Sequence, residues 1–408
     1  MNNQKMFRFY LKYTSKIGAI LIVSIVIFFL LRIIVISHVP QISPGNIPVI
    51  SNLKLPESRI IAVGSPTHGN SEPFKIVLAV LNDLYEKHNS VALILEELAG
   101  DAEIINSLHT YSSPEGVSVG MHSIYDNDEM SDILNWLNKF EQRLYGIDIQ
   151  SVSGTTKVLS SALKDLGFAE SKKVLDLVVT SRTAIVQNNT FLLAIEEFIR
   201  TQRDAKLISD QAFTYLQHLL DCIKMNYKYL LSDCSSQIRD EMMAKNVEWI
   251  MNYESTYFQN DYAVLFASNG HAIKCNWSYD FIKDSYVPMG AHLAATYGEN
   301  YFVILTDAQY NNFEALSNAA KRKDIFHVKN DHLSPFLTAS GNDTAILSKS
   351  LWSSNDSQDI TLTIIGSTFS TIRSLNTSYY TVQVPLSDSC NILLGFKTMT
   401  PISRHESR

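Results

Sequence analysis

Three short apolar runs each lead to a polar side chain, and this pattern constrains the fold more than any other feature. The runs read as strands at 59–64, 91–95 and 262–267, and they lead to His68, Glu96 and His271 respectively. In folds with a parallel sheet, side chains just past the carboxyl ends of neighbouring strands form the ligand site. The sequence therefore predicts that these three residues meet at one edge of a sheet.

The order of predicted elements indicates an α/β fold. Helices are expected at about 72–88, 100–108 and 128–142, a strand at 144–148, a helix or turn at 288–297, a strand at 301–305 and a β-rich end at 359–401. The stretch 155–257 contains no proline and reads as consecutive helices. Alternating strands and helices predict a mostly parallel sheet with helices on both faces. The prediction is thus an α/β domain over 59–401 with an inserted helical subdomain at about 155–257.

The first residues of the chain predict a membrane anchor. Residues 17–36 are apolar apart from Ser24 and Arg32, and no acidic residue precedes Glu57. A helix of this length rises about 30 Å, which spans the hydrocarbon core of a bilayer. The basic flank places the N-terminus in the cytoplasm and the main domain outside. The organisation is therefore a basic segment with a single-pass transmembrane helix at 1–37, a proline-containing linker at 38–58, the main domain, and a tail at 402–408.

Composition excludes several classes of protein. The net charge of −7 gives no reason to expect nucleic acid as a partner. The chain contains no GxSxG nucleophile elbow and no phosphate-binding loop, and no motif calls for a cofactor. The four cysteines lack CxxC spacing, so we expect no metal knuckle. Cys222 and Cys234 form the best disulfide candidate in an exported domain, with free thiols as the alternative. The sequence does not indicate an oligomeric state.

The residue types at the three strand ends suit activation of water. A histidine takes a proton near neutral pH, and such general-base catalysis typically contributes about 10²–10⁴-fold to a rate. Glu96 could orient the imidazole of His68, as the acid does in a catalytic triad, or it could itself be the base. His271 could polarise a carbonyl or act as a general acid. Two histidines and a carboxylate could also bind a metal, although no local metal motif supports that.

At these residues the chain resembles the erythromycin esterase family. The similarity runs collinearly from about residue 59 to 401, through the blocks GSPTHGNSE, LILEELAGDAEIIN, NWLNKF with YGIDIQ, RDEMMAKNVEWI, SNGHAIK, PMGAHL and LLGFKTMTP. The resemblance implies a hydrolase that cleaves an ester or lactone with a histidine-activated water.

The resemblance also implies roles for particular residues. The base histidine of the family falls on His68, its strand-end glutamate on Glu96 and its second histidine on His271. Binding positions implied by the matching blocks are Ser65, Glu72, Asp148, Arg239, Asn246 and Asn269.

Two positions depart from the family pattern. Ser65 stands where the family has a glutamate, and Ser268 stands where it has a histidine. These exchanges keep a hydrogen-bonding group but remove a charge, and the electrostatic contribution is often the largest in such sites. Either Glu72 or Glu97 replaces the missing carboxylate, or the chemistry differs, or activity is lost. We therefore expect a membrane-anchored hydrolase of a small-molecule or envelope ester, with a catalytically impaired binding protein or a metal-dependent relative as alternatives.

Overall fold

The computed structural model describes residues 55–108, 124–179, 181–279, 285–317, 323–348 and 359–404. The predicted anchor at 1–37 and most of the predicted linker at 38–58 lie outside the described residues. Within the described ranges, no helix combines the length and the apolar character needed to span a membrane.

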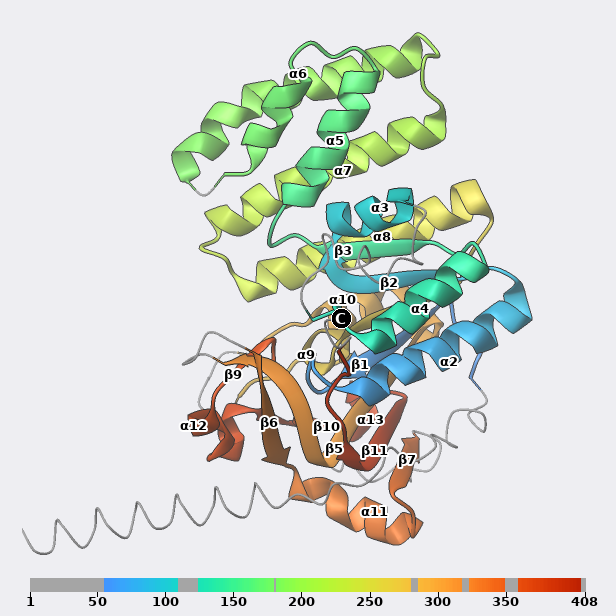
Figure 1. Ribbon diagram of the computed structural model, residues 1–408, viewed down its shortest axis with the longest axis vertical. Coiled ribbons are helices and arrows are strands. Elements are labelled where there is room, and N and C mark those ends of the chain that lie inside the picture. Colours follow the sequence, from blue (N-terminus) through green and yellow to red (C-terminus); the bar gives the residue numbers. More distant parts are fainter. Residues whose placement is uncertain are drawn as a thin grey trace, which may run out of the picture.

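The described residues form a sheet in which most strands are parallel, and the predicted α/β fold is confirmed (Figure 1). The strand order is β3-β2-β4-β1-β5-β11-β7, with β6 and β9 paired to β5. The parallel strands of the main path are β1 (Ile60–Ser65), β2 (Ala92–Leu98), β3 (Leu144–Asp148), β4 (Ala263–Ser268), β5 (Tyr301–Ser317) and β11 (Ile392–Met399). The antiparallel neighbours are β7 (Thr344–Ser348) and β6 (Lys323–Lys329), and β9 (Thr368–Phe369) runs parallel to β5.

The central strands are buried on both faces, which explains their nearly continuous apolar sequences. Along β1, Ile60 and Ala62 pack into one core while Ile61 and Val63 pack into the other. Helices α2 (Ser71–His88) and α4 (Asp128–Lys139) cover one face, whereas α8 (Ser236–Phe258) and α10 (Met289–Tyr297) cover the opposite face. The protein is therefore layered as helix, sheet and helix.

The predicted helical stretch divides into two parts. Helices α5 (Ser153–Asp165), α6 (Arg182–Asp204) and α7 (Asp210–Leu231), with the 3₁₀ helix η2 (Ser171–Leu177), share an apolar core of their own. This lobe lies beyond the β3 edge of the sheet, next to α3 (Ala99–Leu108) (Figure 1). Helix α8 instead packs its apolar face, which includes Met243 and Val247, on the sheet. As a result, its first turn lies at the carboxyl edge of the strands.

The C-terminal part differs most from the expected elements. Strand β5 continues twelve residues beyond the predicted end at 305, because its later half pairs with β6 and β11. Polar residues within it are buried but paired: Asp307 accepts from Asn330, and Asn311 accepts from Asn70. The remaining elements include the antiparallel pair β8 (Asp359–Thr363) and β10 (Thr381–Pro385), and the short helices α11 (Ser334–Ser340), α12 (Thr371–Ser374) and α13 (Leu386–Ser389).

All four cysteines lie in the described residues and are free, so the proposed Cys222–Cys234 disulfide is not formed. Cys222 is buried on α7 with its Sγ 3.5 Å from His218 Nε2, whereas Cys234 is exposed in the turn before α8. Burial raises the pKa of the Cys222 thiol to about 12. The sulfur is therefore held as a protonated core group rather than facing its predicted partner.

Candidate functional site

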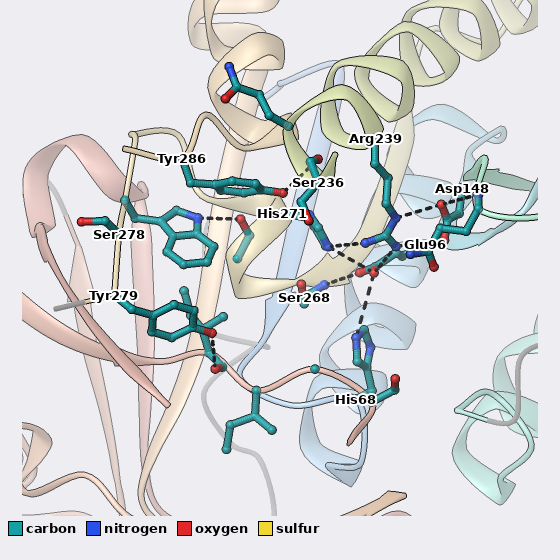
Figure 2. A pocket seen from close by; sticks show the side chains of 18 of the residues that line it. His68, Glu96, Asp148, Ser236, Arg239, Ser268, His271, Ser278, Tyr279 and Tyr286 are labelled. Atoms are coloured by element: carbon teal, nitrogen blue, oxygen red, sulfur yellow. Dashed lines mark hydrogen bonds and ion pairs between the residues drawn. The ribbon is translucent and has the colours of Figure 1, made fainter. Parts of the chain in front are cut away.

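A cavity of about 640 Å³ opens at the carboxyl edge of the sheet, where β2, β4 and β1 lie side by side. Figure 2 shows side chains that line it. Because β4 pairs with both other strands, three loops distant in sequence meet there. The predicted residues His68, Glu96 and His271 all line this cavity, together with Asp148, Arg239 and Ser268. The topology thus brings the three predicted catalytic residues together.

Glu96 is the centre of the polar cluster. Its Oε1 accepts a hydrogen bond from Arg239 Nη2 at 3.0 Å and lies 3.4 Å from His271 Nε2. The same oxygen lies 4.0 Å from His68 Nε2, which leaves the two groups in ion-pair range but beyond direct hydrogen-bond length. The other oxygen, Oε2, accepts from the backbone N–H of Ser268 at 3.0 Å.

The surroundings of Glu96 keep it ionised. Burial alone would raise the pKa of this carboxyl group, but the charges of His271, His68 and Arg239 outweigh burial and hold it well below its usual value. A carboxylate with so low a pKa is a poor proton acceptor at neutral pH. Of the two roles considered for Glu96 from sequence, the low pKa argues against the general base. The 4.0 Å separation from His68 Nε2 supports charge compensation of that ring rather than a hydrogen bond that orients it.

Arg239, in the first turns of α8, links three acidic or basic groups. Its Nε and Nη2 donate to the two oxygens of Asp148, each at 2.9 Å, in a bidentate pair. Its Nη1 lies 3.1 Å from His271 Nε2. Burial would lower the pKa of the guanidinium, but Asp148 and Glu96 raise it, so the positive charge is permanent. Asp148 itself is fixed because its Oδ1 accepts from the backbone of Ile149 and Gln150.

His271 is oriented by a carboxylate that the sequence-based assignment omitted. Asp240 is fully buried, and its carboxylate contacts His271 Nδ1 at 2.8 Å while accepting from the backbone N–H of Met289. Burial lowers the pKa of His271, but the neighbouring Asp240 and Glu96 carboxylates raise it to about 10. The sequence contains one indication of this role. Asp240 is a charged residue next to Arg239, and the following turn of the helix, which includes Met243, is apolar.

Both protonation states of His271 have a partner at Nε2. The protonated ring directs Nε2–H toward Glu96 Oε1, and the neutral ring presents a lone pair to Arg239 Nη1. In either state Nδ1–H donates to Asp240. The ring can therefore release and regain a proton at Nε2 without turning, which is what a general acid requires.

His68 lies in the loop between β1 and α2, with 13% of its side chain exposed. Thr67 and Asn70 fix this loop, because the Thr67 hydroxyl donates to Asn70 Oδ1 at 2.8 Å and Asn70 donates to Asn311. Gly69, which follows His68, lies close to Glu314 of β5, whose carbonyl oxygen would lie 1.8 Å from an added Cβ.

The other predicted binding residues lie around the cavity rather than in it. Ser65 donates its hydroxyl to the Thr67 carbonyl, and the carboxylate of Glu72 accepts three hydrogen bonds from Thr400. Asn246 donates to the Ile147 carbonyl and so ties α8 to β3. Asn269 donates to the Thr306 carbonyl, and its Oδ1 lies against Gly64. None of these four is among the cavity-lining residues.

Glu72 and Glu97, the two acidic residues considered as replacements for the missing glutamate, are not among the described residues that line the cavity. Glu72 holds Thr400, and Glu97 is fully buried with its Oε1 bound to the backbone N–H of Leu98. Within the described residues, no group of three or more histidine, cysteine, aspartate or glutamate side chains is arranged to hold a metal ion.

Comparison with known proteins gives one family. The model of the erythromycin esterase family matches residues 85–362, a segment that contains Glu96, Arg239 and His271 and begins after His68. No curated protein matches the chain.

Solved structures share the fold at low sequence identity. A protein from Bacillus cereus is 17% identical, with a TM-score of 0.68 over 85% of this chain and 90% of its own. A succinoglycan biosynthesis protein is 15% identical, with a TM-score of 0.64 over 85% and 89% of the two chains. A histidine-to-asparagine variant of the erythromycin esterase EreC, in its open conformation, is 13% identical, with a TM-score of 0.60 over 86% and 93%.

Proposed function

The chain belongs to the erythromycin esterase family, and from this premise we propose that it is a hydrolase that cleaves an ester or lactone in the cavity around Glu96. One observation carries the proposal. His68, Arg239 and His271, from three separate segments, all lie within 4.0 Å of one carboxylate oxygen of Glu96. Family membership and fold support a hydrolase-like function, and the mechanism is our inference from these contacts.

In the proposed reaction, His68 takes a proton from water while the water oxygen attacks the carbonyl carbon. Glu96 compensates the charge that forms on the His68 imidazole, 4.0 Å away. Negative charge develops on the carbonyl oxygen and is stabilised by Arg239 and protonated His271. When the tetrahedral intermediate collapses, the C–O bond breaks and the leaving alkoxide takes a proton from His271. The products are a carboxylic acid and an alcohol, with no acyl-enzyme.

A panel of small esters and lactones tests this proposal on the purified full-length chain. The wild type is expected to turn over at least one of them. Glu96→Gln is expected to lower kcat/KM by about 10²-fold or more, because it removes the charge shared by His68, Arg239 and His271. Circular dichroism must show that the variant is folded. Equal turnover by the folded variant and the wild type would contradict the proposal.

A non-catalytic binding protein of the same fold is the second candidate. It is favoured by the contacts of Ser65, whose hydroxyl bonds to Thr67 instead of facing the cavity, and by Glu72, whose carboxylate holds Thr400. The double variant Ser65→Glu with Ser268→His restores both family residues. A gain of ester hydrolysis in this variant from an inactive wild type would support the binding protein. An active wild type would exclude it.

For localisation, we propose that residues 17–36 anchor the protein with its main domain on the extracytoplasmic side. The support is the sequence pattern alone: an apolar run of membrane-spanning length after a basic segment without carboxylates. Protease added to intact spheroplasts should digest the main domain of an anchored protein. Protection of the domain in intact spheroplasts but not in lysed ones would contradict the proposed orientation.

A further inference from the structure

One wall of the cavity is aromatic and rigid. Trp277 and Tyr286 face each other across a short antiparallel bridge, with ring centroids 4.9 Å apart, and Tyr279 packs edge-on against Trp277 at 5.3 Å. Figure 2 shows Tyr279 and Tyr286 on the opposite side of the cavity from Arg239 and Asp148. We call Trp277, Tyr279 and Tyr286 the aromatic wall.

Hydrogen bonds to the backbone hold the rings of the aromatic wall. Trp277 Nε1 donates to the Gly270 carbonyl at 2.9 Å, and the Tyr279 hydroxyl donates to the Ile364 carbonyl at 3.3 Å. The Trp277 ring also lies over Gly270, where an added Cβ would approach it to 3.2 Å. Because the polar ends of Trp277 and Tyr279 are occupied, their apolar surfaces are what they offer to a ligand.

The rest of the described lining is uncharged and combines polar side chains with three isoleucines, Ile124, Ile364 and Ile365. Apart from the cluster around Glu96, the described lining residues with polar side chains carry hydroxyl or amide groups: Gln150, Ser236, Gln237, Ser278, Ser285 and Ser367. An acyl chain or other hydrocarbon ligand would remove these groups from water without giving them partners, which is costly. The lining therefore suits a ligand that has apolar faces and many hydroxyls.

Charge argues against an anionic ligand. Glu96 and Asp148 line the cavity, Asp240 lies behind His271, and Arg239 already contacts Glu96, Asp148 and His271. Among the described lining residues there is no lysine. A negative group on the ligand, other than the oxyanion that forms during the reaction, would meet these carboxylates. Among the described lining residues, the positive charges of Arg239 and protonated His271 are already paired with them.

We propose that the substrate carries its ester on a neutral sugar unit, whose ring packs on the aromatic wall while its hydroxyls bond to the serine and glutamine side chains. This inference rests on the proposed hydrolase function for the reacting ester. The apolar C–H face of a pyranose matches an aromatic ring, and its rim of hydroxyls matches neutral donors and acceptors. A cavity of about 640 Å³ lies within the range of sites that enclose ligands of this size.

The kinetic test compares an acetylated neutral oligosaccharide with p-nitrophenyl acetate, which lacks the sugar. Trp277→Ala and Tyr279→Ala are expected to lower kcat/KM for the sugar ester at least about tenfold more than for p-nitrophenyl acetate. Trp277→Phe, which keeps an aromatic ring, should recover much of the loss. Tyr379→Ala, at an exposed tyrosine outside the cavity, is the matched control and should change neither value. Parallel losses on both substrates would overturn the proposal.

A binding test separates this inference from the proposed function. Neutral oligosaccharides are titrated calorimetrically into the His68→Gln variant, with and without Trp277→Ala. Binding that depends on Trp277 supports the sugar site even if no ester is hydrolysed, in which case only the hydrolase proposal fails. Hydrolysis of p-nitrophenyl acetate without any oligosaccharide binding overturns the sugar site and leaves the hydrolase. Stronger binding of a hexuronate or a decanoate ester than of the neutral sugar would also overturn the proposed sugar site.

Discussion

Asp240→Asn should remove most of the pH dependence of stability that comes from His271. Asp240 contacts Nδ1 of His271 and the backbone N–H of Met289, so the amide cannot replace it at both positions. If its oxygen keeps Met289, its NH₂ group faces Nδ1 and forces the ring proton to Nε2. The protonated ring then loses the acceptor that Asp240 provides for Nδ1–H in the wild type.

The magnitude follows from the raised pKa of His271. The pKa rises from 6.5 to about 10 on folding, so the folded state holds the proton more tightly. The resulting stabilisation is fully present below pH 6.5 and is lost as the pH rises toward 10. Between pH 6.5 and 8.0 the contribution of His271 to the unfolding free energy falls by about 1.6 kcal/mol. In Asp240→Asn this fall should largely vanish, and at pH 6.5 the variant should be about 3–5 kcal/mol less stable.

Urea unfolding of wild type and variant at pH 6.5 and 8.0 measures this difference. Stopping at pH 8.0 limits the contribution of the thiols of buried Cys222 and Cys390 and half-buried Cys275, whose pKa values burial raises to about 12. Other groups that titrate in this range contribute equally to the unfolding free energy of both proteins, so their contribution cancels in the comparison. An equal change of unfolding free energy with pH in both proteins would refute the assigned role of Asp240.

Three further predictions concern Arg239, Gly69 and Asp307. Arg239→Lys should lower kcat/KM for a small ester by about 10²-fold in steady-state assays, because one ammonium group cannot contact Asp148, Glu96 and His271 together; full activity would contradict this. Gly69→Ala should lower the free energy of unfolding, measured in urea, by about 3 kcal/mol or more, because the added Cβ would meet the Glu314 carbonyl. A loss near zero would contradict this and show that β5 moves to make room for the methyl group. Burial raises the pKa of Asp307 to about 6 from 3.8, so wild-type stability should fall by about 2 kcal/mol from pH 4 to 6 relative to Asp307→Asn; parallel curves in urea titrations would contradict this.

The sequence was most informative where apolar runs met polar ends. His68, Glu96 and His271 could be assigned to one cavity because parallel strands bring their carboxyl ends to the same edge of a sheet. The strand order, which places β4 between β2 and β1, is a long-range property, and it decides which of these residues touch. Sequence alone therefore gave the members of the cluster but not the central position of Glu96.

The residues that were predicted to bind a ligand but do not line the cavity have one feature in common. Ser65, Asn246 and Asn269 bond to backbone carbonyls near the cavity, and a polar side chain that satisfies the backbone looks in sequence like one that binds a ligand. Asp240 lies in the matching block RDEMMAKNVEWI but was assigned no role, because its contacts with His271 and with the backbone of Met289 are long-range and cannot be read from the sequence. The long strand β5 was cut short because buried Asp307 and Asn311 interrupt its apolar run.

The most direct test of the central claim is kcat/KM of His68→Gln and wild type for one activated ester that the wild type hydrolyses. Glutamine keeps a hydrogen-bonding side chain in the loop but cannot accept the proton of the attacking water. We predict a loss of about 10²-fold or more, with an unchanged far-ultraviolet circular dichroism spectrum. Wild-type turnover by the folded variant would show that another group activates the water.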